Sequence, residues 1–160
     1  MKKEKASIYL ANTILAILLI LIGLLFLPQL FGIHAYVVES GSMEPTLKVG
    51  TIAYVLPTVI EELEEGDIVS FEEASHIITH RVVTIDKESQ TLKTKGDAGA
   101  FADFFLVRGD MLVGKMILSI NYLGLPVLLA QSGYGKLLFL SLFTLLMIIH
   151  LQRREGATAH

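Results

Sequence analysis

Apolar and polar positions divide this chain into three blocks. Residues 8–27 form an apolar run without a charged residue, and residues 132–152 form a second apolar block that is densest at Leu137–Leu151. Between them, residues 28–131 mix apolar with polar positions. A helix needs about 20 apolar residues to cross a bilayer core of about 30 Å. The pattern therefore predicts a transmembrane anchor at 8–27 and a transmembrane or interfacial helix at 132–152.

The first apolar run also invites interpretation as a cleaved signal peptide. Its basic start, "MKKEK", suits either an anchor or a signal peptide. However, the run is longer than the roughly 7–15 apolar residues of a signal-peptide core, and it ends in "FLPQ" rather than in an A-x-A-like cleavage site. These features favour an uncleaved anchor. For the second block, the Arg153-Arg154 pair that follows favours a membrane span over an interfacial helix.

The middle block has the signals of short β-strands. "AYVVES", "TIAYVL", "HIITHRVVTID" and "TLKTKGD" are rich in β-branched and aromatic residues, and "GDIVSF" and "GDMLVGKMIL" each open on a Gly-Asp turn. Short strands separated by turns at this density are typical of an all-β fold. Residues 28–131 are therefore expected to form one β-rich domain.

Charge is distributed unevenly along the chain. Basic residues flank the two apolar blocks, whereas residues 28–135 contain 7 basic and 14 acidic residues, a formal charge of −7. By the positive-inside rule, residues 1–7 and 153–160 face the cytoplasm and the acidic domain lies on the extracytoplasmic side. Without a basic patch to neutralise phosphates, no nucleic-acid partner is expected.

The composition also limits the chemistry. The chain has no cysteine, which excludes disulfides, a thiolate nucleophile and cysteine-ligated metal. "HIITH" has the i, i+4 spacing of zinc-binding histidines on a helix, but its β-branched filler favours a strand. On a strand its two histidines, His76 and His80, are about 13 Å apart. That separation is too large for one zinc ion, so neither a metal nor another cofactor is expected.

The polar hexapeptide "SGSMEP", Ser40–Pro45, stands out because it closely follows the first apolar run. A serine becomes a useful nucleophile only beside a base, such as a histidine or a lysine. The candidate bases in the middle block are His34, His76, His80 and Lys95.

Four segments together indicate a family. "SGSMEPTL", "GDIVSF", "THRVV" and "KGDAGAFAD" occur in this order behind an N-terminal apolar run. The set resembles type I signal peptidases, membrane-anchored serine proteases that remove signal peptides from exported proteins, and the resemblance covers essentially the whole chain. In one branch of this family the base in the "THRVV" segment is lysine. Histidine at this place resembles the branch found in the endoplasmic reticulum, in archaea and in some Gram-positive spore formers.

The resemblance implies roles for individual residues. Ser42 is the nucleophile, and Ser40 forms the oxyanion hole with the backbone N–H of Ser42. His80 is the general base, oriented by Asp97 or by Asp103. The family usually has "GDNN" where this chain has "GDAG", which removes amide side chains from the loop.

The resemblance also implies a substrate and a place of action. An extended preprotein would add as a strand along "AYVVES", contacting Tyr36, Val37 and Val38, with Met43 packed beside the nucleophile. Cleavage would follow small residues. The expected partners are preprotein signal peptides, the lipid bilayer and the secretion translocon, at the cell membrane or at an endoplasmic-reticulum-type membrane.

Two alternatives remain from the sequence. A non-catalytic, membrane-tethered accessory subunit would retain the fold without the reaction. A serine hydrolase using Lys95 as its base would retain a reaction with a different proton acceptor.

Overall fold

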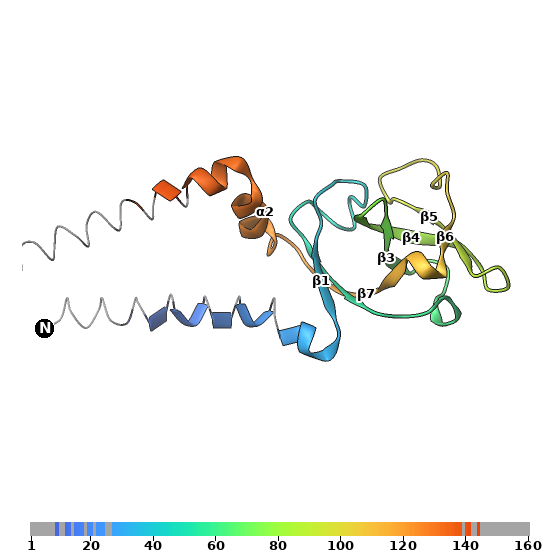
Figure 1. Ribbon diagram of the computed structural model, residues 1–160, viewed down its shortest axis with the longest axis horizontal. Helices are drawn as coiled ribbons and strands as arrows, with labels where there is room; N and C mark the ends of the chain where they lie inside the picture. The colour runs from blue at the N-terminus through green and yellow to red at the C-terminus, as the bar shows by residue number, and fades with distance from the viewer. Residues whose placement is uncertain are drawn as a thin grey trace, which may run out of the picture.

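A computed structural model describes residues 27–138 continuously, and the flanking segments at single positions only (Figure 1). These single positions are residues 9, 12–13, 15–17, 19–20, 22–24, 140–141 and 144. The predicted termini, 1–7 and 153–160, lie outside the described residues, as does much of the predicted helices at 8–27 and 132–152. Among the residues that are described, no helix is both long enough and apolar enough to span a bilayer.

A single antiparallel sheet of seven strands organises the middle block, in the order β1-β2-β7-β3-β4-β5-β6. The predominantly β fold expected from the sequence is thus confirmed. The strands are β1 (His34–Val37), β2 (Ile52–Leu56), β3 (Ile68–Glu73), β4 (His76–Asp86), β5 (Thr91–Lys95), β6 (Val107–Arg108) and β7 (Leu112–Ile120). Short 3-10 helices are η1 (Leu27–Phe31), η2 (Ile60–Glu62) and η3 (Gly109–Met111).

One α-helix, α2 (Leu125–Gln131), lies inside the block predicted to be β-rich. Pro126 stands in its first turn, where a missing backbone N–H costs nothing, and leucine, valine and alanine follow. Residues 133–138 are helical again, so the helical region begins earlier than the predicted boundary at 132. The apolar composition of "LPVLLA" suits a strand or a helix equally, and its packing against β1 decides in favour of the helix.

The β3–β4 hairpin sets the direction of the candidate base. Its turn residues, Ala74 and Ser75, have φ values of 47° and 66°, as the twist of a tight hairpin turn demands. The resulting register places His80 opposite Val69. Since a shift of one residue would turn every side chain of β4 to the other face, this short turn determines where the imidazole points.

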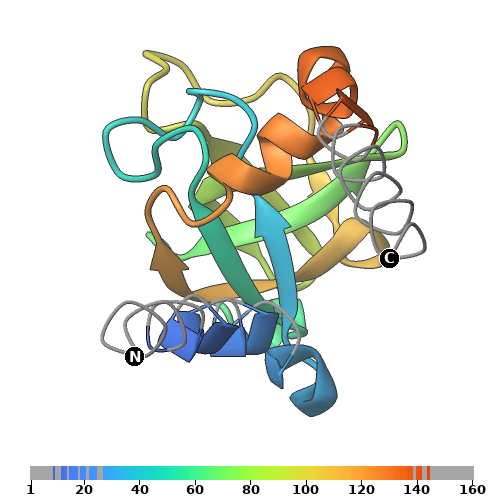
Figure 2. The same cartoon turned by 90° about the vertical axis from the view of Figure 1, so that its left-hand side faces the viewer.

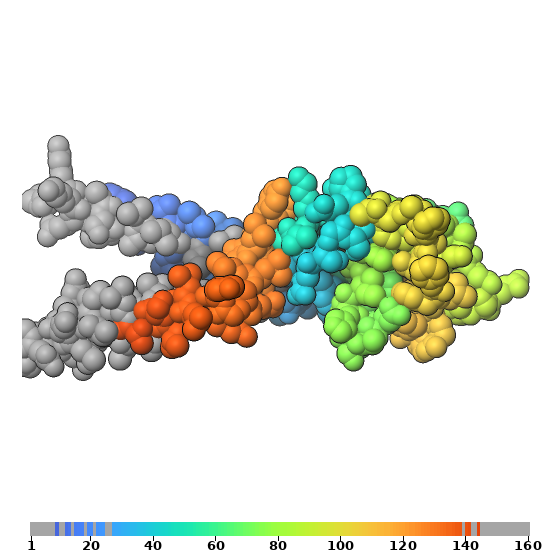
Figure 3. Space-filling model, turned by 90° about the horizontal axis from the view of Figure 1, so that it is seen from above, coloured from blue at the N-terminus to red at the C-terminus, as the bar shows by residue number. Residues whose placement is uncertain are grey.

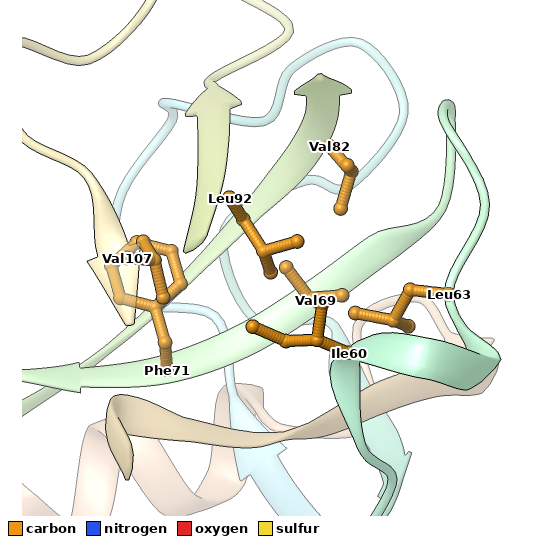
Figure 4. Packing of buried hydrophobic residues seen from close by; sticks show 7 residues of the cluster. All are labelled: Ile60, Leu63, Val69, Phe71, Val82, Leu92 and Val107. Atoms are coloured by element: carbon orange, nitrogen blue, oxygen red, sulfur yellow. The ribbon is translucent and has the colours of Figure 1, made fainter. Parts of the chain in front are cut away.

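The main hydrophobic core supports the strands that surround the candidate site (Figure 4). It comprises Ile60, Leu63, Val69, Phe71, Val82, Leu92 and Val107, each at most 2% exposed. Full burial of such a side chain stabilises the fold by about 1.5–3 kcal/mol. The ring of Phe71 also meets the imidazole of His80 edge-on, with centroids 6.3 Å apart. The core therefore fixes one face of the candidate base.

Candidate active site

The "SGSMEP" turn presents its serines to solvent because its methionine is buried. Met43 is 1% exposed and packs in a second cluster with Leu47 and Ile68. The backbone N–H of Leu47 donates to the carbonyl of Met43 at 2.9 Å, which closes the turn. Ser42 is exposed, and its Oγ lies 3.3 Å from the Oγ of Ser40. The two hydroxyls that the sequence singles out are thus neighbours on an anchored turn.

His80 contacts one of the two candidate aspartates. Its Nδ1 lies 2.7 Å from Oδ2 of Asp103, and both side chains are largely buried. The same Oδ2 accepts a hydrogen bond of 2.6 Å from the hydroxyl of Thr94. The backbone N–H of Asp103 donates to the carbonyl of Thr94 at 2.8 Å. With a proton on Nδ1, the imidazole donates to the carboxylate, and Nε2 is left as a proton acceptor.

The Nε2 atom of His80 and the Ser42 backbone converge on Gly96. A Cβ atom at Gly96 would lie 3.1 Å from Nε2 and 2.6 Å from the carbonyl oxygen of Ser42. The same carbonyl accepts a hydrogen bond of 2.9 Å from the N–H of Ala98. A glycine is therefore required where β5 ends, because a side chain there would separate the imidazole from the turn that contains Ser42. The "GDAG" segment holds this turn through its backbone.

Asp97 has different partners from Asp103. It accepts two hydrogen bonds from the guanidinium of Arg81, at 2.8 and 2.6 Å, and one of 2.5 Å from the hydroxyl of Thr46. The hydrogen bonds from Arg81 hold the pKa of the Asp97 carboxyl below its usual range. Asp97 thus joins β4 to the segment that follows Ser42. Of the two aspartates left open by the sequence, Asp103 is the one in contact with His80.

Lys95, the alternative base, lies on a different face of the sheet. It is paired opposite Arg81, the residue after His80. Successive side chains of a strand point to opposite faces, so Lys95 shares the face of Arg81. There it lines a hollow of 370 Å³ with Arg81 and Asp97. This position separates the Lys95 ammonium from the imidazole face of the sheet.

A groove of 620 Å³ runs to the exposed serines. One wall is the free edge of β1 with the residues that follow it, and includes all four predicted substrate contacts: Tyr36, Val37, Val38 and Met43. Burial, and secondarily the Glu72 carboxylate, raise the pKa of the Tyr36 phenol, so it stays neutral. The groove therefore combines a lining of mixed apolar and polar side chains with a strand edge that has no neighbour among the described residues.

The opposite wall comes from residues that the sequence analysis did not select as substrate contacts, although His76 among them was a candidate base. Residues 75–79 line it, and they precede the part of β4 that pairs with β5 from Arg81 onward. Val127 and Gln131 of α2 complete the lining. For the β4 wall, the sequence contains one signal that could have predicted its position, because the segment "HIITH" ends at His80. Nothing in the local sequence of α2 indicates its place beside the groove.

A serine, an imidazole and a carboxylate arranged in this way can perform acyl transfer, the reaction of serine hydrolases. Residues 10–94 match the family described as "Signal peptidase, peptidase S26", and the chain belongs to this family. It is 42% identical over 80 residues to Signal peptidase I W of Bacillus subtilis (strain 168). That match covers 48% of this chain and 42% of the relative, less than half of the relative's length. The family match includes Ser42 and His80 and ends before Asp97 and Asp103.

Proposed function

We propose that this protein is a membrane-bound signal peptidase, a serine endopeptidase that cleaves signal peptides from exported preproteins after small residues. Family membership supports the class of reaction. The observation that most favours catalysis is the 2.7 Å contact between His80 and Asp103, with Nε2 directed at the glycine that touches Ser42. An accessory subunit that had lost the reaction would have no need to keep this arrangement.

The reaction follows from the positions of these groups. The Ser42 hydroxyl attacks the scissile carbonyl while Nε2 of His80 takes its proton, and Asp103 stabilises the imidazolium that forms. The Ser40 hydroxyl and the Ser42 backbone N–H donate to the developing oxyanion. One such donor is worth about 3–4 kcal/mol in the transition state. The imidazolium then protonates the leaving amine, and water hydrolyses the acyl-enzyme on Ser42.

The substrate enters as an extended chain between two strand edges. Within the described part of the chain, β1 pairs only with β2 and the first half of β4 pairs only with β3, so both present free backbone groups toward the groove. An added strand satisfies such groups with its own backbone. Val38 packs against the buried cluster that contains Met43, and both residues line the groove with Ser42. Small residues before the scissile bond would pack against this part of the lining.

The membrane location rests on the two apolar blocks, 8–27 and 132–152, and their basic flanks. The hydroxyl of Tyr54 in β2 donates to the carbonyl of Leu24 at 2.9 Å, which ties the first apolar block to the sheet. The groove would therefore lie at the extracytoplasmic surface, where a signal peptide leaves the bilayer. The partners are preproteins, the bilayer and, by extension, the secretion translocon.

The test uses the full chain purified in detergent with a secretory preprotein, and mass spectrometry of the products. The parent should cut once after a small residue, Ser42→Ala should cut nothing, and Lys95→Ala should retain activity within about twofold. Equal cleavage by the parent and by Ser42→Ala would remove Ser42 from the mechanism. No cleavage by the parent in detergent or in liposomes would favour the accessory-subunit alternative, and loss of activity in Lys95→Ala would favour the serine–lysine alternative.

A further inference from the structure

Helix α2 lies across the end of β1 and forms one side of the groove (Figure 2). Seen from above, it sits beside the segment that contains the nucleophile turn (Figure 3). Val127 and Gln131 both line the groove, and they are four residues apart, which places them on one face of the helix. Leu125 and Leu129 are 45% and 51% exposed, and they line a separate hollow with Leu128.

The start of α2 is fixed against β1 by two glycines. The N–H of Gly124 donates to the carbonyl of Gly50 at 2.9 Å. A Cβ atom at Gly124 would lie 2.7 Å from Cγ1 of Val37, so only glycine permits this approach. Gly50 has a φ of +84°, and a Cβ there would collide with the side chain of Leu125. These contacts make α2 a defined wall of the groove, seated at the level of Val37.

The position of α2 along the groove identifies which part of a substrate it meets. β1 ends at Val37, and the chain then bends into the turn that contains Ser42, so Val37 and Ser42 lie at different places along the lining of the groove. The groove extends from Ser42 back along β1, whose first residue follows η1 and the first apolar block. A signal peptide that shares the membrane with this block approaches the nucleophile from that side. Its residues before the cleavage motif therefore pass α2.

We propose that Val127 and Gln131 contact signal-peptide residues on the N-terminal side of the small-residue cleavage motif, and so help to select the preproteins that are cut. This inference rests on the proposed peptidase function. Val127 is half-buried and provides an apolar contact, whereas Gln131 is exposed and provides a polar contact at the edge of the groove. Both residues lie beyond the span matched by the family, residues 10–94.

The main test exchanges charge at Gln131, an exposed position where folding should not change. Gln131→Lys and Gln131→Glu are compared on two preproteins that differ only in having Glu or Lys five residues before the cleavage site. The preference of each variant is measured as kcat/KM for the Glu preprotein divided by kcat/KM for the Lys preprotein. Relative to the parent, this preference should rise about two- to fivefold in Gln131→Lys and fall by a similar factor in Gln131→Glu. In a control pair of preproteins, the same charges lie five residues after the cleavage site, and the ratio should not move.

A second test changes volume on the two faces of the helix. Val127→Phe should lower kcat/KM about tenfold for a preprotein with a bulky residue at the contacted position, and glycine at that position should restore the rate. Leu129→Phe, the matched change on the other face, should act as the parent does. If the parent cleaves but neither the Gln131 ratio nor the Val127→Phe rate changes, the inference is wrong and the proposed function stands. If the parent cleaves no preprotein, both fail.

Discussion

Thr94 is the most informative residue to change, because it acts on the base only through Asp103. Its side chain is fully buried, and its hydroxyl donates to the same carboxylate oxygen that faces His80. Thr94→Val preserves the shape of the side chain and removes this one donor. Thr94→Ser preserves the donor and removes one buried methyl group. The two variants thus separate hydrogen bonding from packing at a single position.

The expected size of each effect follows from these contacts. A hydrogen bond to a charged group contributes about 1.5–3 kcal/mol, and a loss of about 1.4 kcal/mol in the transition state corresponds to tenfold in rate. Thr94→Val should therefore lower kcat/KM about tenfold or more. Losing one buried CH₂-sized group costs about 0.8 kcal/mol of folding free energy, so Thr94→Ser should lower the melting temperature by a few degrees and keep nearly full activity.

The comparison of the two variants gives a signature that a purely structural role would not produce. Thr94→Val should lose activity out of proportion to its loss of stability, whereas Thr94→Ser should lose stability and keep its activity. The assay is kcat/KM for one preprotein, beside thermal unfolding. Parental activity in Thr94→Val would refute this reasoning, as would an equal loss in Thr94→Ser.

Two further predictions concern the loop after β5. Gly96→Ala should reduce kcat/KM at least tenfold, because the new Cβ would lie 2.6 Å from the Ser42 carbonyl oxygen. Its circular dichroism spectrum should match that of the parent. A fully active variant would contradict the site geometry. The second prediction concerns Asp97, whose pKa Arg81 lowers in the folded state. The ionised carboxylate therefore stabilises the fold at pH values above its unfolded pKa of about 4. This stabilisation is lost as the pH falls through the lower, folded pKa. Thermal unfolding between pH 2 and 7 should show a weaker acid dependence in Asp97→Asn than in the parent, and identical profiles would show that this pair adds no stability.

The sequence by itself indicated six of the seven strands, the turn that contains Ser42, and the family. β-Branched runs and Gly-Asp turns are local signals, so they marked these six strands without reference to the rest of the chain. The sequence analysis did not predict the two-residue strand β6, Val107–Arg108. The "SGSMEP" and "THRVV" segments likewise contain Ser42 and His80 in their own few residues. The apolar blocks at both ends remain sequence-based predictions of membrane segments.

Only the tertiary structure separated the two aspartates. Asp97 and Asp103 lie in one loop, and nothing local distinguishes the carboxylate that meets an imidazole from the one that meets a guanidinium. The distinction arises because His80 and Arg81 are adjacent on β4 and point to opposite faces, so each selects a different aspartate from the loop after β5. For the same reason, the sequence did not exclude Lys95, which the register places beside Arg81.

The far wall of the groove was also decided by long-range packing. The edge of β1 could be anticipated from "AYVVES". The second side of the groove, however, is formed by residues of β4 together with helix α2, which lies some 50 residues further along the chain. The close approach of Gly50 and Gly124 brings α2 to this place. Glycine gives no indication in a sequence of which backbone it will touch, so the residues of α2 that line the groove could be found only in the folded chain.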